Sequence, residues 1–302
     1  MLYQPDEPRN NAIINNQVGA DQRLFRKPAG PEVQELINSV IKHGYVIMEK
    51  IFTHAEVDEA IQELRRLADD AGTAGPASAG GRNKFEGFRT KRIYALLNKS
   101  RVFDKFATSP KAMALNDYFL DLGWLLNTFH SISIQPGEEP QTQHHDDGHV
   151  TLPRPHRPLG TAIMVSLDAY TETNGSTIVV PESHEWGADR VLSPSEAIPV
   201  VMPKGSVVCF LGTLWHGGGQ NMSDVERRAL TVQYCQPWIR PFENQFLAVD
   251  FEKLPQIPKQ LVDMMGYLVS APFVGYVDGK SPLRAVEKHL QRREMKNLVA
   301  RL

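Results

Sequence analysis

The hydrophobic pattern between residues 31 and 121 is mostly helical. It predicts helices over residues 31–44, 54–72 and about 110–121, with a short strand over 45–48. In the first helix, apolar residues at helical spacing form one stripe, Pro31 can occupy the first turn and Gly44 marks the end. Thr53 and Glu56 have the spacing of a capping box, which predicts the start of the second helix.

From about residue 125 the pattern changes to short β-type runs separated by Gly, Pro, Asn and Asp. Strands are predicted over residues 128–135, 161–167, 177–180, 197–202, 206–211 and 229–236. Strands at this spacing indicate a sandwich or a jelly roll and not a parallel α/β sheet.

The two ends of the chain differ from this core. After Pro255 the pattern returns to helix, and Val286, Leu290, Leu298 and Val299 form an apolar stripe among many Lys and Arg. Residues 1–30 are polar and are predicted to form a loosely held arm. We therefore expect an N-terminal arm over residues 1–30 and a single domain over residues 31–302. Its parts would be helices, a jelly-roll core over about residues 125–240, and a helical tail.

Two segments are candidate walls of an active-site entrance. Residues 72–83 contain Gly, Ala, Ser, Thr and Pro with one Arg and one Asn, so they are predicted to pack little and to form a mobile loop. Residues 150–158 carry Arg154, His156 and Arg157. The alternative for both segments is an ordinary surface loop.

Composition narrows the class of protein. The 302 residues have a formal net charge of −2, which gives no electrostatic argument for binding nucleic acid or a membrane surface. No apolar run approaches the length of a membrane span, and the N-terminus has no apolar signal core. The only cysteines, Cys209 and Cys235, lie in apolar runs and are expected to be reduced, buried thiols in a cytoplasmic protein, either a monomer or a homodimer.

The candidate chemistry lies in the run His144-His145-Asp146-Asp147 and in a distant histidine, His216. Two imidazoles and one carboxylate form the ligand set that holds non-haem Fe(II) on one face and leaves other coordination positions open. On a strand, residues two apart face the same side. His144 with Asp146, or His145 with Asp147, can therefore supply the first two ligands, and spacing alone leaves both open.

The strand after His216 carries adjacent arginines, of which only one can face inward. Arg227 shares its face with the small residues Ala229 and Thr231, which leave room for a co-substrate. This parity favours Arg227 over Arg228 as the anchor of a carboxylate, which its guanidinium can bind through two parallel hydrogen bonds. The alternative is a surface arginine that pairs with a neighbouring acid.

These residues resemble the phytanoyl-CoA dioxygenase family of Fe(II)- and 2-oxoglutarate-dependent oxygenases. The similar stretches span about residues 135–245 in the family's order and spacing. They are Pro136-Gly137-Glu138, Gln141 to Asp147, Leu167-Asp168, Thr173 to Thr177, Val180 to His184, Gly205 to Val207, Trp215 to Asn221, Arg227, Pro237-Trp238 and Glu243 to Gln245. One departure is Glu182, where relatives usually have Gly. His184 in the same turn is expected to be structural.

The resemblance implies a double-stranded β-helix, a cupin-like jelly roll, with flanking helices. The family pattern Gln-x-x-His-x-Asp selects His144 and Asp146, with His216, as the Fe(II) ligands. It assigns the 2-oxoglutarate carboxylate to Arg227 and further contacts of this co-substrate to Gln141 and Thr177. Related halogenases have a small residue in place of the carboxylate, so Asp146 implies oxygenation with O₂.

The expected activity is therefore hydroxylation of an unactivated C–H bond, with release of succinate and CO₂. Desaturation, epoxidation and rearrangement remain open. The chain has no glycine-rich phosphate loop that would indicate a nucleotide, which favours a small, lipophilic metabolite as the substrate. The alternatives are an iron oxygenase that uses no 2-oxoglutarate and a non-catalytic jelly roll that binds a metabolite.

Overall fold

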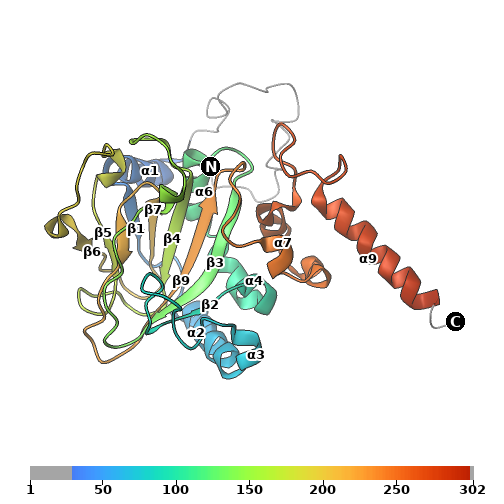
Figure 1. Cartoon of the computed structure of the whole chain (residues 1–302), viewed down its shortest axis with the longest axis horizontal. Helices are drawn as coiled ribbons and strands as arrows, with labels where there is room; N and C mark the ends of the chain where they lie inside the picture. The colour runs from blue at the N-terminus through green and yellow to red at the C-terminus, as the bar shows by residue number, and fades with distance from the viewer. Residues whose placement is uncertain (1–28, 300–302) are drawn as a thin grey trace.

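Two antiparallel sheets form the centre of the computed structural model, which describes residues 29–299 (Figure 1). The large sheet has the strand order β1 (Tyr45–Met48), β7 (Val207–Leu211), β4 (Gly160–Ser166), β9 (Arg227–Cys235), β3 (Leu125–Ile134) and β2 (Thr90–Ile93). The small sheet has the order β6 (Ile198–Pro199), β5 (Thr177–Val179) and β8 (His216–Gly218). This architecture is the predicted jelly roll, mainly β with flanking helices.

The helices surround the sheets. They are α1 (Pro31–His43), α2 (His54–Asp69), α3 (Ala71–Ala74), α4 (Leu96–Lys99), α5 (Asp104–Ala107), α6 (Pro110–Phe119), α7 (Gln245–Ala248), α8 (Lys259–Val262) and α9 (Pro282–Val299). The 3₁₀ turns are η2 (Arg101–Phe103), η3 (Asp146–His149), η4 (Ser183–Glu185), η5 (Pro194–Glu196) and η6 (Phe251–Gln256), and η7 (Asp263–Tyr267) is a π-type turn. None of the helices in residues 29–299 combines the length and apolar character of a membrane span.

The predicted helices and strands are confirmed, with shifted ends. The first helix ends at Gly44, whose left-handed conformation (φ 83°) caps it, and the capping box of Thr53 and Glu56 is present at the start of α2. Strands β2 and β8 were not predicted from the sequence. Residues 1–28 of the predicted N-terminal arm lie outside the described residues.

The predicted loop over residues 72–83 is partly wrong. The short helix α3 reaches into it, and the side chains of Ala74 and Ala77 are buried. The Ala77 carbonyl also accepts a hydrogen bond from the Arg92 backbone at 2.8 Å. Small side chains allow this close approach, so the segment packs against β2 and does not simply extend into solvent.

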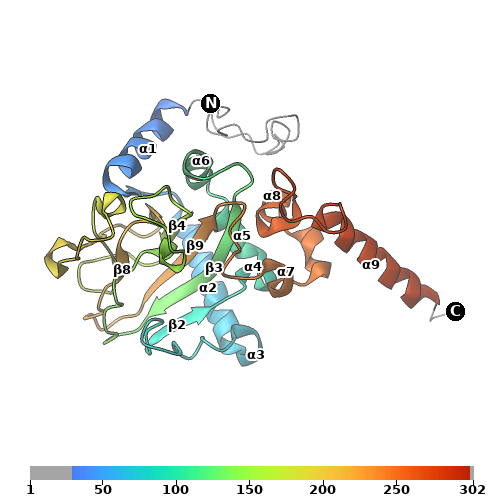
Figure 2. The same cartoon turned by 45° about the horizontal axis from the view of Figure 1, so that its top comes forward.

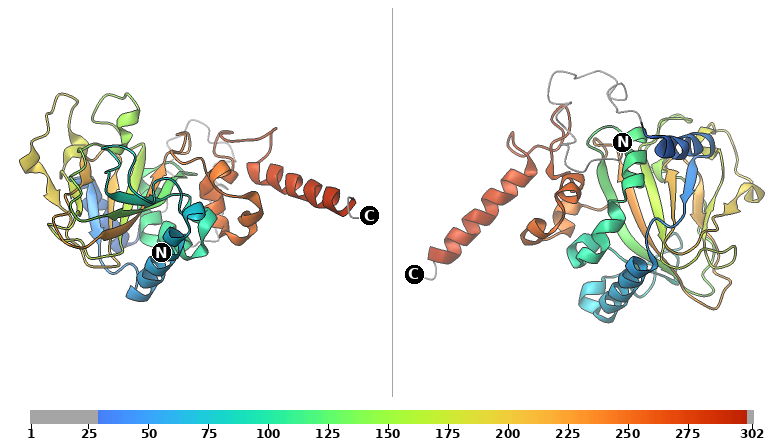
Figure 3. Two further views of the ribbon diagram at one scale, coloured as in Figure 1. Left: turned by 60° about the horizontal axis from the view of Figure 1, so that its bottom comes forward. Right: turned by 180° about the vertical axis from the view of Figure 1, so that it is seen from behind.

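Alternation along the strands divides the interior into two layers. On β9, Leu230, Val232 and Tyr234 belong to the core that lies under the helices, whereas Ala229 belongs to the core between the sheets. In Figures 2 and 3, α1, α2 and α6 lie against the outer side of the large sheet, and α9 runs away from both sheets. The two faces of the large sheet therefore pack against different layers of the interior.

Cys209 and Cys235 are free and buried, as predicted. Burial raises the pKa of both thiols to about 12, so they remain protonated and unreactive at neutral pH.

Candidate metal centre and co-substrate pocket

A two-residue β-bridge brings the distant histidines together. The His144 backbone N–H donates to the His216 carbonyl at 2.9 Å, and the His216 N–H donates back to the His144 carbonyl at 2.8 Å. The chain then turns at η3, and Asp146 comes back toward both imidazoles. Its Oδ1 atom lies 3.6 Å from Nε2 of His144 and 3.6 Å from Nε2 of His216.

Both imidazoles are oriented by backbone carbonyls. Nδ1 of His144 lies 3.0 Å from the Thr142 carbonyl, and Nδ1 of His216 lies 2.9 Å from the Leu214 carbonyl. Because a carbonyl only accepts, each Nδ1 carries the proton and each Nε2 keeps a free lone pair. The two lone pairs therefore belong to the nitrogens that lie next to Asp146.

This cluster fits a divalent transition metal. One ligand atom from each of His144, Asp146 and His216 lies within 4.8 Å of the others, and no other such group of His, Cys, Asp or Glu occurs in the described part of the chain. With ligand bonds of about 2.1 Å, an ion reaches atoms up to about 4.2 Å apart, so both nitrogen–oxygen pairs are close enough. Two nitrogens and one oxygen match the facial set of non-haem iron oxygenases.

Electrostatics favour an ionised carboxylate in this cluster. Burial acts to raise the pKa of Asp146, but the neighbouring imidazoles outweigh it and the pKa is lowered. Burial lowers the pKa of His216, which favours its neutral, metal-binding form.

The alternative pair, His145 and Asp147, does not join this cluster. The His145 ring packs edge-on against Trp215, with centroids 5.1 Å apart. Asp147 accepts a hydrogen bond from the Leu159 backbone at 2.8 Å, and burial raises its pKa to about 7. The expectation that a strand continues through residues 144–147 is wrong, because Asp146 begins a 3₁₀ turn. The turn separates His144 and Asp146 from His145 and Asp147.

Arg227 lies in the same cavity and is only 1% exposed. Its Nε and Nη2 donate to the Gly175 carbonyl, its Nη1 donates to the Tyr170 hydroxyl at 3.0 Å, and its guanidinium lies 4.5 Å from the centre of the Tyr170 ring. Within residues 29–299, no carboxylate forms an ion pair with it. Burial lowers the pKa of Arg227, but arginine remains charged in proteins. Arg227 is thus a buried cation held by neutral groups.

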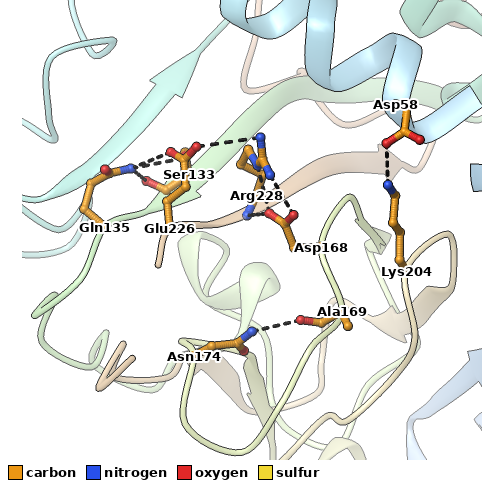
Figure 4. Close-up of polar contacts among 9 residues, drawn as sticks. All are labelled: Asp58, Ser133, Gln135, Asp168, Ala169, Asn174, Lys204, Glu226 and Arg228. Atoms are coloured by element: carbon orange, nitrogen blue, oxygen red, sulfur yellow. Dashed lines mark hydrogen bonds and ion pairs between the residues drawn. The ribbon is translucent and has the colours of Figure 1, made fainter. Parts of the chain in front are cut away.

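Arg228 faces the other side of β9. It binds both oxygens of Asp168 at 2.8 Å, and its Nη1 lies 3.7 Å from Glu226 (Figure 4). The ion pair that the sequence analysis considered for Arg227 is therefore formed by Arg228 instead.

Gln141 and Thr177 also line the cavity. The Gln141 side chain donates to the Phe85 carbonyl at 3.0 Å and accepts from the Gly218 backbone at 3.0 Å. Thr177 is buried on β5. Near them, a Cβ atom on Gly219 would lie 2.8 Å from the Ser176 carbonyl, so the close approach of these two residues, which follow β8 and precede β5, requires glycine.

The cavity has a volume of about 910 Å³. Its wall includes residues 82–87, so the predicted entrance segment 72–83 contributes only Arg82 and Asn83. Residues 150–158 do not line it, and the prediction for them is wrong because Arg154 instead binds the carbonyls of Ser183 and Thr213.

Arg92 of β2 also lines this cavity, which was not predicted from the sequence. Arg92 is buried, donates to the Glu86 carbonyl, and adds a second buried cation to the wall. His184, expected to be structural, is buried and donates from Nε2 to the Ile41 carbonyl at 3.0 Å. Glu182 holds the turn before it at φ 65°, in the left-handed region that glycine takes more easily.

A jelly roll with two imidazoles, one carboxylate and a buried arginine in one cavity defines the class of non-haem iron oxygenases. The model of the phytanoyl-CoA dioxygenase (PhyH) family matches residues 41–229. The chain therefore belongs to the phytanoyl-CoA dioxygenase family and is an Fe(II)- and 2-oxoglutarate-dependent dioxygenase, with O₂ as the second co-substrate.

Similar proteins include several fungal dioxygenases. Dioxygenase FUM3 of Gibberella moniliformis is 26% identical over 85% of this chain and 88% of its own length. Dioxygenase ALT11 of Alternaria alternata is 25% identical over 90% of this chain and 92% of its own length. Among solved structures, the epimerase SnoN in complex with Fe³⁺, α-ketoglutarate and nogalamycin RO has a TM-score of 0.56. It is 20% identical in sequence, and the match covers 72% of this chain and 89% of the epimerase chain. The two proteins are therefore similar in fold.

Proposed function

We propose that this dioxygenase hydroxylates an unactivated C–H bond of a small, lipophilic metabolite. The balanced reaction is R–H + O₂ + 2-oxoglutarate → R–OH + succinate + CO₂. One observation carries the proposal: Arg227, a buried cation without a carboxylate partner among the described residues, lies in the same cavity as the His144, Asp146 and His216 cluster.

His144, Asp146 and His216 would hold the metal through two nitrogens and one oxygen. Bound Fe(II) supplies the activation of O₂ and the oxidative decarboxylation of 2-oxoglutarate. The carbonyls of Thr142 and Leu214 keep the imidazole lone pairs directed at the metal position.

Arg227 would bind the far carboxylate of 2-oxoglutarate. A buried charge is costly unless it is paired. Binding of an anion next to Arg227 would therefore remove the cost of the unpaired charge. Gln141 and Thr177 line the same space and would contact the co-substrate through an amide and a hydroxyl. Arg92 would add positive charge that favours the dianion over neutral molecules.

The remaining cavity suits a small organic substrate. A volume of about 910 Å³ falls within the range of about 300–1,000 Å³ of small-molecule sites. Apolar side chains line much of it, including Phe85, Phe210, Trp215 and Phe242. The rings of Phe85 and Phe210 contact His144 and His216, with centroids 4.8 and 4.4 Å apart, and would exclude water beside the metal.

The proposal is tested by a screen for succinate release over a panel of lipophilic metabolites, followed by mass spectrometry under ¹⁸O₂. Hydroxylation adds one labelled oxygen to the product and places one in succinate. A product that has lost two hydrogens without gaining label would contradict hydroxylation and indicate desaturation.

The same experiment separates the competing functions. If product forms equally well without 2-oxoglutarate, the enzyme is an iron oxygenase that takes its electrons from the substrate, and Arg227 has another role. We also propose a cytoplasmic location, which the two free, buried cysteines support.

A further inference from the structure

Gln233 contacts the carboxylate of the metal cluster from the side opposite to the histidines. Its Nε2 donates to Oδ2 of Asp146 at 3.1 Å, whereas Oδ1 of Asp146 lies next to both imidazoles. Each carboxylate oxygen thus has a separate neighbour. Gln233 is half-buried and lines the wall of the main cavity.

The fold places Gln233 here by the same alternation that buries Arg227. Residues 227, 229, 231 and 233 of β9 share one face, and Gln233 lies opposite Thr128 on β3 and Ala162 on β4. One strand therefore carries the guanidinium at one end of the cavity and this amide at the metal end.

A chain of hydrogen bonds fixes which end of the amide faces Asp146. The Phe242 backbone N–H, which only donates, binds Oδ1 of Asn127 at 2.7 Å. The Asn127 Nδ2 therefore points the other way and donates to Oε1 of Gln233 at 3.5 Å. This leaves Nε2 of Gln233 for Asp146.

We propose that Gln233 is a positioning residue that holds Asp146 so that Oδ1 alone faces the metal. The histidines are oriented by their carbonyls, but without Gln233 the carboxylate could rotate about its bond to Cβ or bind through both oxygens. A fixed, single-oxygen contact leaves more coordination positions for 2-oxoglutarate and O₂. This inference rests on the proposed metal site.

The test is anaerobic titration of the metal-free protein with Fe(II), and with Co(II) for its visible spectrum. Gln233→Met keeps the length of the side chain and removes the amide. We expect it to bind either metal about 10–100-fold more weakly than the wild type and to change the Co(II) spectrum. Gln233→Ala, which also lacks the amide but adds no bulk, should give the same result.

Gln135 provides a matched control. Its Nε2 donates to a carboxylate oxygen of Glu226 at the same 3.1 Å, away from the metal cluster (Figure 4). Gln135→Met should leave metal affinity and the Co(II) spectrum unchanged, and all variants should melt near the wild-type temperature without metal. Wild-type metal affinity in Gln233→Met and Gln233→Ala would overturn the inference. If the wild type and Asp146→Ala bind metal equally, the proposed metal site itself is wrong.

Discussion

Replacing Arg227 by Met should abolish tight binding of 2-oxoglutarate while the protein remains folded. Methionine has a similar length and no charge, so it removes the cation without leaving a large void. Folding is expected to tolerate the change because two effects oppose each other. The Gly175 carbonyl and the Tyr170 hydroxyl lose their donor, but a buried charge that no described carboxylate neutralises is also lost.

The size of the effect follows from the hydrogen bonds of the guanidinium. Arg227 has five N–H donors, and three are engaged by Gly175 and Tyr170, which leaves two for a carboxylate. Two hydrogen bonds to a charged group contribute about 3–6 kcal/mol together. The dissociation constant of 2-oxoglutarate should therefore rise by about 10²–10⁴-fold.

The assay is anaerobic titration of the Fe(II)-loaded protein with 2-oxoglutarate, followed by calorimetry or by the visible charge-transfer band. Arg228→Met is the control, because Arg228 binds Asp168 outside the cavity. It should lower stability, because Asp168 loses both hydrogen bonds from the guanidinium, and leave the affinity for 2-oxoglutarate unchanged. Equal loss of affinity in the two variants would refute the assignment of Arg227.

The other predictions concern the ligands, the cavity wall and pH. His144→Ala should abolish Fe(II) binding and turnover, whereas His145→Ala should retain most of both; the reverse in a metal titration would favour the other pair. Phe85→Ala should raise succinate formation in the absence of substrate several-fold by admitting water beside the metal, whereas Phe88→Ala, which is also exposed but lies outside the cavity wall, should not. Burial raises the pKa of Asp104 to about 6. The folded protein therefore holds the Asp104 proton more tightly than the unfolded chain does. The resulting contribution to the free energy of unfolding should be complete below about pH 4 and be lost as the pH rises through 6. Asp104→Asn should gain melting temperature relative to the wild type between pH 4 and 7, and a constant difference over that range would contradict the shift.

Strong periodicity explains which parts of the fold could be predicted. The stripe of α1, the capping box of α2 and the alternation in β9 are local patterns, and each predicted its element. The same alternation predicted that Arg227 and Arg228 face opposite sides. It also places Gln233 on the same face of β9 as Arg227, so the location of Gln233 in the cavity could have been predicted.

The missed elements have no local signal. β2 has the sequence Thr-Lys-Arg-Ile and β8 has His-Gly-Gly, and both exist because they pair with β3 and β5. Arg92 was missed together with β2. The prediction for residues 72–83 was partly wrong because small side chains do not distinguish the two cases. Alanine is common in solvent-exposed loops, but it also allows a segment to pack closely against a neighbouring backbone.

The convergence of His144, Asp146 and His216 depends on contacts between distant parts of the chain. Spacing left two pairs open between residues 144 and 147, and the family resemblance was needed to choose. The physical reason for the choice is the bridge between His144 and His216 followed by the turn at Asp146. The division into an arm over residues 1–30 and one domain over residues 31–302 stays a prediction.

The most direct test of the central claim is the visible spectrum of the anaerobic protein after addition of Fe(II) and then 2-oxoglutarate. The wild type should bind one equivalent of iron and develop a weak charge-transfer band, and Asp146→Ala and His216→Ala should show none. Absence of the band in the wild type, or bands of equal strength in the variants, would contradict an iron site formed by His144, Asp146 and His216.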